Sequence, residues 1–204
     1  MKSAHSAVKK DRSYRGSLGA ERTRLRRAQL IEAGQMRFGA DGYAAVSVRG
    51  VCAEARLTER YFYESFANRE ELLAAVYLDS VGQLTAGIQE AIDASGTLTE
   101  QIHAGLGAYF GFIKTHRLAA RVILLEVLGV SAAIDAIYRE VMSQFAQLLQ
   151  TRLRLPHATL VATGLVGAAV NIATQWMLGG YRSPQRAVLE SSARIFLAVA
   201  PESK

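Results

Sequence analysis

The stretch SVRGVCAEARLTERYFYESF, residues 47–66, decides the fold of the N-terminal part of this chain. Ser47 suits a helix N-cap. Apolar residues then recur at spacings of three and four, at Val48, Val51, Cys52 and Ala55. A second helix begins almost at once, with Thr58 as its cap and Phe62 and Phe66 on its buried side. Two helices joined by a turn of about three or four residues form a helix-turn-helix, whose second helix enters the major groove of DNA.

The flanking sequence extends this motif on both sides. Upstream, LIEAGQMRFGADGYAAVSVRGV contains a helix that ends in a Phe-x-x-x-Gly-Tyr pattern at Phe38, Gly42 and Tyr43. Downstream, TERYFYESFANREELL contains the spaced residues Tyr63, Phe66, Arg69, Glu70 and Leu72. Together, residues 24–72 resemble the DNA-binding head of the tetracycline-repressor (TetR) family of bacterial transcription regulators. The resemblance implies an all-α fold of about nine helices, in which a larger helical domain for ligand binding and dimerisation follows the head.

The chain departs from the family pattern at two places. Arg56 occupies the turn where the family usually has glycine, and a non-glycine residue with positive φ costs about 1 kcal/mol. Either the turn relaxes to another conformation, or Arg56 keeps a positive φ at this cost in free energy. The second helix also starts with the bulky run Glu59, Arg60 and Tyr61 in place of the family's smaller residues. The DNA sequence that the head recognises is therefore not transferable from the family.

Composition agrees with an all-α regulator. The 204 residues are 50% hydrophobic, with three prolines and no alternating run bounded by hairpin signals. The single cysteine, Cys52, excludes an intramolecular disulfide and is expected to be a small core residue. We predict three parts: a disordered basic arm over 1–21, the helix-turn-helix domain over 22–72, and the ligand-binding and dimerisation domain over 73–204.

Positive charge is concentrated at the N-terminus. Residues 1–40 contain ten Lys or Arg and three Asp or Glu, a net charge of +7, whereas the whole chain carries +6. This excess lies beside the predicted head, where it would attract DNA phosphates. The arm over 1–21 either lies along a groove of DNA or is a solubilising tail with no defined contact. No apolar segment follows the first charges, so we expect no secretory signal.

Longer amphipathic helices follow the head. We predict helices over about 69–92, 98–114, 118–130 and 133–153, then two that begin at Pro156 and Pro184, with Thr99 as a cap. Residues 155–181 contain no Asp, Glu, Lys or Arg, and 27 residues are enough to span a membrane. The Thr, Asn, Gln, Gly and Ala residues within this segment favour a buried oligomer interface instead. The resemblance implies that helices at about 157–179 and 184–199 form a four-helix bundle across a two-fold axis.

The DNA-contact hypotheses combine the resemblance with side-chain chemistry. Arg60 can donate to guanine, Glu59 can accept from cytosine, and Tyr61 can pack on a thymine methyl group. The hydroxyl residues at helix N-termini, together with tyrosine and arginine side chains, can hold phosphates. The alternative for Glu59 and Arg60 is a surface ion pair, and for Tyr63 it is partial packing. The predicted DNA-binding residues are Ser47, Val48, Arg49, Thr58, Glu59, Arg60, Tyr61, Tyr63 and Arg69.

The resemblance also implies a ligand pocket inside the helices between about Leu98 and Gly180. Such a pocket is mainly apolar with a few polar anchors. Glu126 is the best single candidate, because a carboxylate in the apolar run VILLEVL needs a partner. Alternatively, Glu126 forms an ion pair with Arg121 or Arg117. The aromatic candidates are alternatively ordinary core residues. The predicted residues are His103, Tyr109, Phe110, Phe112, His116, Glu126, Met142, Phe145, Asn171, Gln175, Trp176 and Met177.

The sequence therefore predicts a homodimeric regulator that binds a palindromic operator, most simply a repressor released by a small apolar or amphipathic ligand. The alternative is a helix-turn-helix dimer without small-molecule input. We expect no enzyme activity, cofactor, metal or membrane association, because no Gly-rich phosphate loop, His-Glu-x-x-His or Gly-x-Ser-x-Gly motif is present. The expected location is the bacterial cytoplasm, at the nucleoid when the protein is bound to its operator.

Overall fold

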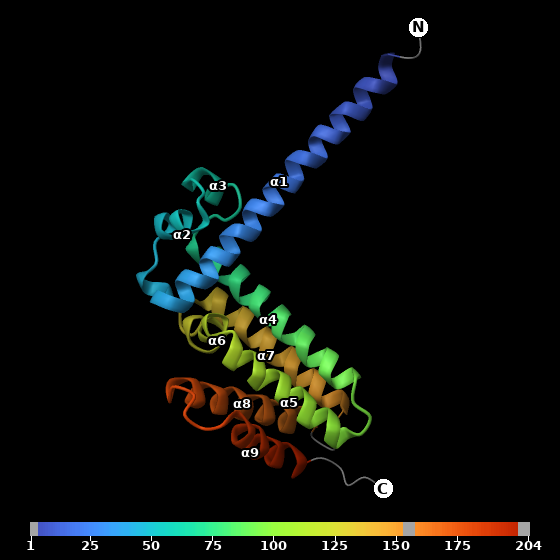
Figure 1. Cartoon of the computed structure of the whole chain (residues 1–204), viewed down its shortest axis with the longest axis vertical. Helices are drawn as coiled ribbons and strands as arrows, with labels where there is room; N and C mark the ends of the chain where they lie inside the picture. The colour runs from blue at the N-terminus through green and yellow to red at the C-terminus, as the bar shows by residue number, and fades with distance from the viewer. Residues whose placement is uncertain (1–3, 153–157, 200–204) are drawn as a thin grey trace.

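The computed structural model describes residues 4–152 and 158–199, and within these ranges every regular element is helical (Figure 1). The all-α prediction is confirmed. The elements are α1 (Ala4–Asp41), η1 (Tyr43–Ala45), α2 (Val48–Ala55), α3 (Glu59–Tyr63), α4 (Arg69–Asp93), α5 (Leu98–Thr115), α6 (Arg117–Arg121), η2 (Val122–Glu126), α7 (Ala132–Arg152), α8 (Ala158–Leu178) and α9 (Gln185–Leu197).

Helix α1 begins earlier than the sequence suggests. We expected disorder over 1–21, whereas the backbone of residues 4–21 continues α1, and residues 1–3 lie outside the described residues. Once a helix has formed, each added residue gains a hydrogen bond at little further cost, and no proline interrupts this stretch. The division of the chain into an arm, a head and a larger domain stays a prediction.

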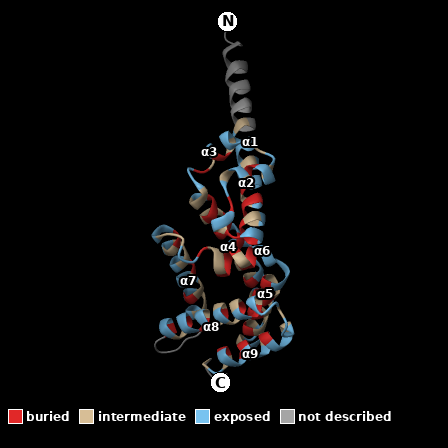
Figure 2. Ribbon diagram, turned by 90° about the vertical axis from the view of Figure 1, so that its left-hand side faces the viewer, coloured by how far each residue is buried: buried red, intermediate tan, exposed pale blue. Residues whose placement is uncertain are grey.

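The head is built from α1, α2, α3 and the first turns of α4. Its core contains Phe38, Val51 and Phe62, each with no exposed surface. Cys52 is 3% exposed in the same core, which confirms its expected role as a small buried residue. Burial raises the pKa of its thiol, so Cys52 is not a reactive thiolate. Figure 2 shows this buried strip where α1, α2 and α4 meet.

The body contains α4 to α9. Helix α4 packs on α5, α5 on α9, and α7 on α8, while the C-terminal end of α1 packs on α6 (Figure 1). The predicted helix over 118–130 is instead α6 followed by the π-helical turn η2. Thr97, not Thr99, caps α5, in a capping box with Glu100. The helix start expected at Pro156 lies outside the described residues, and Pro184 directly precedes α9.

Helix α8 has two different faces. Ala162, Leu165, Ala169, Ala173 and Trp176 are buried on one side. On the other side Leu160 is 74% exposed and Leu178 is 62% exposed, with Gly164, Gly167 and Asn171 between them. Among the described residues, α8 is long and apolar enough to cross a membrane by length and composition. In its apolar stretch of 18 residues, 33% are buried. A helix of a protein core passes the same test, so this property alone does not distinguish the two environments.

Candidate DNA-reading head and ligand cleft

The turn between α2 and α3 keeps a left-handed residue without glycine. Arg56 has φ 55° and ψ 38°, and it is exposed. The next amide, Leu57 N–H, donates to the Cys52 carbonyl at 2.9 Å, which closes the end of α2 as in a Schellman turn. At the other end of α2, the Ser47 hydroxyl accepts from Gly50 N–H at 3.1 Å, which confirms Ser47 as its cap. The turn therefore keeps a positive φ at Arg56, at a cost in free energy, and does not relax to another conformation.

Replacing Arg56 with glycine should stabilise the protein by about 0.5–1 kcal/mol, because glycine adopts positive φ without the steric cost of a Cβ atom. Chemical denaturation measures this change. Arg56→Ala is the matched control, since it removes the same charge but keeps the Cβ atom, and it should bring no gain. Equal stability of the two variants would show that the turn carries no strain.

The outer face of α3 presents the predicted base-reading residues. Arg60 is 83% exposed, and its Nε donates to Glu64 at 3.1 Å. The expected alternative, a pair of Arg60 with Glu59, is not formed. Arg26 of α1 also donates to Glu64, at 3.3 Å, and its guanidinium lies 4.1 Å from the centre of the Tyr61 ring. These contacts hold α3 against α1 and leave most of the Arg60 guanidinium facing solvent.

The remaining predicted DNA contacts differ in their surroundings. Tyr63 is 58% exposed, although its ring packs edge-on against Phe62, so both expected environments are present together. Thr58 begins α3 without a side-chain capping bond. Arg49 and Glu59 are exposed, and Val48 is half-buried.

Arg69 has structural contacts that the sequence did not predict. One guanidinium nitrogen donates to the backbone carbonyls of Tyr43 and Val46, and the guanidinium carbon lies 4.9 Å from the Tyr43 ring centre. These bonds tie the start of α4 to the loop before α2. Arg69 is thus a structural clamp within the head, and its role as a phosphate ligand stays a prediction.

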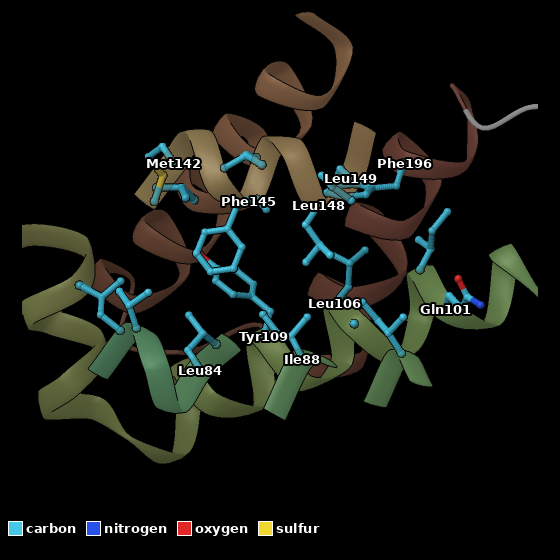
Figure 3. Close-up of a pocket in the computed structure, with 18 of the residues that line it drawn as sticks. Leu84, Ile88, Gln101, Leu106, Tyr109, Met142, Phe145, Leu148, Leu149 and Phe196 are labelled. Carbon is cyan, nitrogen blue, oxygen red and sulfur yellow. The ribbon is translucent and has the colours of Figure 1, made fainter. Parts of the chain in front are cut away.

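A long apolar cleft lies within the body, between α4, α5, α7, α8 and α9 (Figure 3). Its cavity volume is about 130 Å³, and the cleft is partly open to solvent. Of the predicted pocket residues, Tyr109, Met142 and Phe145 line it. Most of the lining is aliphatic and was not singled out from the sequence. These aliphatic residues recur at the helical spacing of ordinary core residues, so the sequence does not distinguish them. They include Leu84, Ile88, Ile92, Ile102, Leu106, Ile123, Leu148 and Leu149.

The other predicted pocket residues lie elsewhere. Asn171 borders a second, more polar hollow between α7 and α8, together with Met142. Phe110 and Trp176 pack edge-on in the core, and the Trp176 indole N–H donates to the Ser183 carbonyl at 2.9 Å. Five more lie outside the cleft: Phe112 stacks on His116, His103 lies 3.9 Å from Glu190, Gln175 is exposed, and Met177 packs on the core.

Glu126 is also outside the cleft, and it joins the body to the head. Its carboxylate accepts from the backbone N–H of Tyr43 at 2.7 Å and from Arg121 Nε at 2.8 Å. The predicted alternative, pairing with Arg121, is therefore found, together with a contact to the head that the sequence did not show. Ile123, in the same π-helical turn, lines the cleft. This one turn contacts both the cleft and the head.

The head has the geometry of a helix-turn-helix, with an exposed second helix held on a basic first helix, which defines a DNA-binding transcription regulator. A family model described as "Bacterial regulatory proteins, tetR family" matches residues 30–76. This match covers the head and supports a TetR-family regulator. The family consists of transcription regulators, which agrees with the expectation that the chain is not an enzyme.

Known proteins support this assignment. An uncharacterized HTH-type transcriptional regulator, YhgD of Bacillus subtilis, is 25% identical over 122 residues, which are 58% of this chain and 64% of that protein. The match thus spans less than two thirds of the curated relative. Among solved structures, the fatty acid degradation regulator FadR from Bacillus halodurans gives a TM-score of 0.76 at 17% identity, covering 84% of this chain and 94% of that one. FadR from Bacillus subtilis in complex with stearoyl-CoA gives 0.77 at 17% identity, covering 85% and 99%.

Proposed function

We propose that this regulator is a homodimeric repressor that binds a palindromic operator and is released when an apolar or amphipathic ligand enters the cleft. The observation that carries the proposal is the position of η2, where Ile123 lines the cleft and Glu126 holds the head. A ligand that displaces Ile123 would move Glu126 and with it the end of α1. Because operator binding requires two heads at a fixed spacing, a small displacement is enough to weaken it.

Dimerisation through α8 and α9 is supported by their exposed faces. The uncharged face of α8 carries Gly164 and Gly167 between Leu160 and Leu178. On α9, Ile195 is 43% exposed beside small residues. Small residues allow two helices to approach closely, and the flanking large apolar side chains would be buried by a second copy. A two-fold dimer places its recognition helices about 34 Å apart, one turn of duplex DNA.

The ligand class follows from the lining of the cleft. Nineteen residues line it, and apart from Gln101 and Tyr109 their side chains are apolar or absent. Ligand pockets are mainly apolar with a few polar groups, and the lining of the cleft fits this description. The similar FadR of Bacillus subtilis has been solved with stearoyl-CoA, whose acyl chain is long and apolar. We infer a hydrophobic ligand for this chain too, and a cytoplasmic location at the nucleoid when DNA is bound.

The DNA-reading part of the proposal is tested with an operator selected in vitro from random DNA by the wild-type protein. The selected sites should be palindromic, and the protein should sediment as a dimer. Arg60→Ala should weaken binding by about 1 kcal/mol per half-site, or roughly thirtyfold for the dimer, because Glu64 already holds one of the arginine donors. Arg139→Ala, which removes an exposed arginine of α7, should leave gel-shift affinity unchanged.

Equal binding by the Arg60 variant and its control would show that Arg60 does not read bases. A monodisperse monomer in detergent-free ultracentrifugation would contradict the dimer. The ligand part is tested separately by thermal melting with a panel of apolar compounds, since a ligand of the native dimer raises the melting temperature by mass action. If compounds bind without releasing the operator, the alternative regulator without small-molecule input is favoured.

A further inference from the structure

Three tyrosines gather where the cleft ends on the side of the head. Tyr109 of α5 lines the cleft and is 9% exposed. Tyr77 lies one helical turn before the lining residue Val81 on α4, and Tyr138 one turn before Met142 on α7. The rings of Tyr77 and Tyr138 are 6.4 Å apart between centroids. Tyr77 and Tyr138 thus lie next to the end of the cleft that Val81 and Met142 line.

The hydroxyls of Tyr77 and Tyr109 are buried without a hydrogen-bond partner in the described part of the chain. Buried hydroxyls in native proteins nearly always have a partner, so the unpaired hydroxyl of Tyr109, which lines the cleft, points to an acceptor that binds there. Burial raises the pKa of both phenols above the ordinary value, and the neighbouring Tyr138 adds to the effect. Both groups therefore stay protonated and able to donate at physiological pH.

The rest of the cleft excludes a charged partner for these donors. Its other polar side chain, Gln101, lies at the opposite end from Met142 and Phe145 in Figure 3, and no lining residue is charged. A carboxylate at the inner end would be desolvated without a counterion, which is strongly unfavourable. The Tyr109 ring reaches from α5 toward Phe145 of α7 among the side chains that line the cleft (Figure 3).

We propose that the cleft selects an elongated, uncharged apolar molecule with a neutral hydrogen-bond acceptor, such as a ketone or ester carbonyl, at its inner end. Tyr109 donates to this oxygen, while Tyr77 and Tyr138 form the wall behind it. This inference rests on the proposed function, in which the cleft is the effector site. It goes beyond that function in assigning the polarity of the ligand and the residue that recognises it.

The test compares two pairs of compounds that differ in one carbonyl oxygen: fluorenone with fluorene, and methyl undecyl ketone with tridecane. Titration calorimetry on the full chain measures their affinities for wild type and for Tyr109→Phe. The ratio of ketone to hydrocarbon affinity should fall about tenfold in Tyr109→Phe, the size of one buried hydrogen bond. Comparing the same ligands on two proteins cancels their different solubilities. Tyr181→Phe, which removes a hydroxyl bonded to the Ile113 carbonyl outside the cleft, is the control and should keep the wild-type ratio.

The melting temperature of the ligand-free variants gives a second readout. Tyr109→Phe should be at least as stable as wild type, because it removes an unsatisfied hydroxyl. A clear loss of stability would mean that a structural water holds this group, and would overturn the inference. An unchanged ratio of ketone to hydrocarbon affinity in Tyr109→Phe would also overturn the inference. The proposed function survives that result if both members of a pair still release the operator. If no compound of either pair binds the wild type, this inference fails, whereas the proposed function fails only if the wider panel of apolar compounds gives no ligand either.

Discussion

Replacing Gly39 by alanine should destabilise the protein by about 1–3 kcal/mol, although the same change in a free helix stabilises it. A Cβ atom at Gly39 would lie 2.6 Å from the Leu118 carbonyl oxygen and 2.7 Å from its Cα atom. These are backbone atoms of α6, so the clash cannot be relieved by turning a side chain. Either α6 moves away from α1 or the new methyl group is forced against it. Thermal and chemical denaturation measure the loss.

The matched control is Gly82→Ala in α4. Nothing lies within 4 Å of a Cβ atom placed at Gly82, so this variant should gain up to about 1 kcal/mol from helix propensity alone. Since Gly39 is where the head meets α6, its alanine variant should also bind the operator more weakly. A Gly39→Ala protein as stable as Gly82→Ala would show that α1 and α6 do not pack this closely.

The local features of the head could be predicted because each depends on neighbouring residues. The Ser47 cap bonds an amide three residues away, and the burial of Val51 and Phe62 follows from apolar spacing within their own helices. Arg69 could not be assigned in this way. Its acceptors, the carbonyls of Tyr43 and Val46, lie more than twenty residues earlier in the chain. The sequence pattern shows only an arginine at the start of a helix, where an exposed side chain is expected.

The body was less predictable for two physical reasons. The run from Val122 to Val127 is buried on several sides, so it has no amphipathic period from which the π-helical turn could be recognised. The cleft is lined by aliphatic residues at ordinary helical spacing, and only the way in which the helices meet separates its walls from filled core. Aromatic residues are therefore poor guides to it, as Phe110 and Trp176 show by packing against each other.

Glu126 illustrates what a sequence can and cannot show about coupling. A carboxylate in an apolar run needs a partner, and this requirement is visible in the sequence. The partner on the head, the Tyr43 amide, lies 83 residues earlier and depends on the positive φ of 86° at Gly42, which turns the chain toward η2. The carboxylate is 14% exposed, so water cannot replace these bonds readily.

Replacing Glu126 by alanine should therefore reduce the free energy of unfolding by about 1.5–3 kcal/mol, the value of hydrogen bonds to a buried charged group. The Tyr43 amide loses its acceptor and Arg121 loses its counterion. The amide of Tyr43 should exchange with solvent faster, which hydrogen exchange at that residue measures directly. Operator affinity should fall, because the angle between head and body is less fixed and the spacing of the two recognition helices becomes variable.

Glu126→Gln separates the two bonds of this junction. The amide oxygen of glutamine can still accept from Tyr43 N–H, whereas the ionic contribution with Arg121 is lost. This variant should lie between wild type and Glu126→Ala in stability and keep most of the protection of the Tyr43 amide. A double-mutant cycle with Arg121→Ala isolates the Glu126–Arg121 term, and the Tyr43 bond should remain when that term is removed. If Glu126→Ala leaves both stability and Tyr43 exchange unchanged, η2 does not hold the head, and a ligand in the cleft must act on the head by another route.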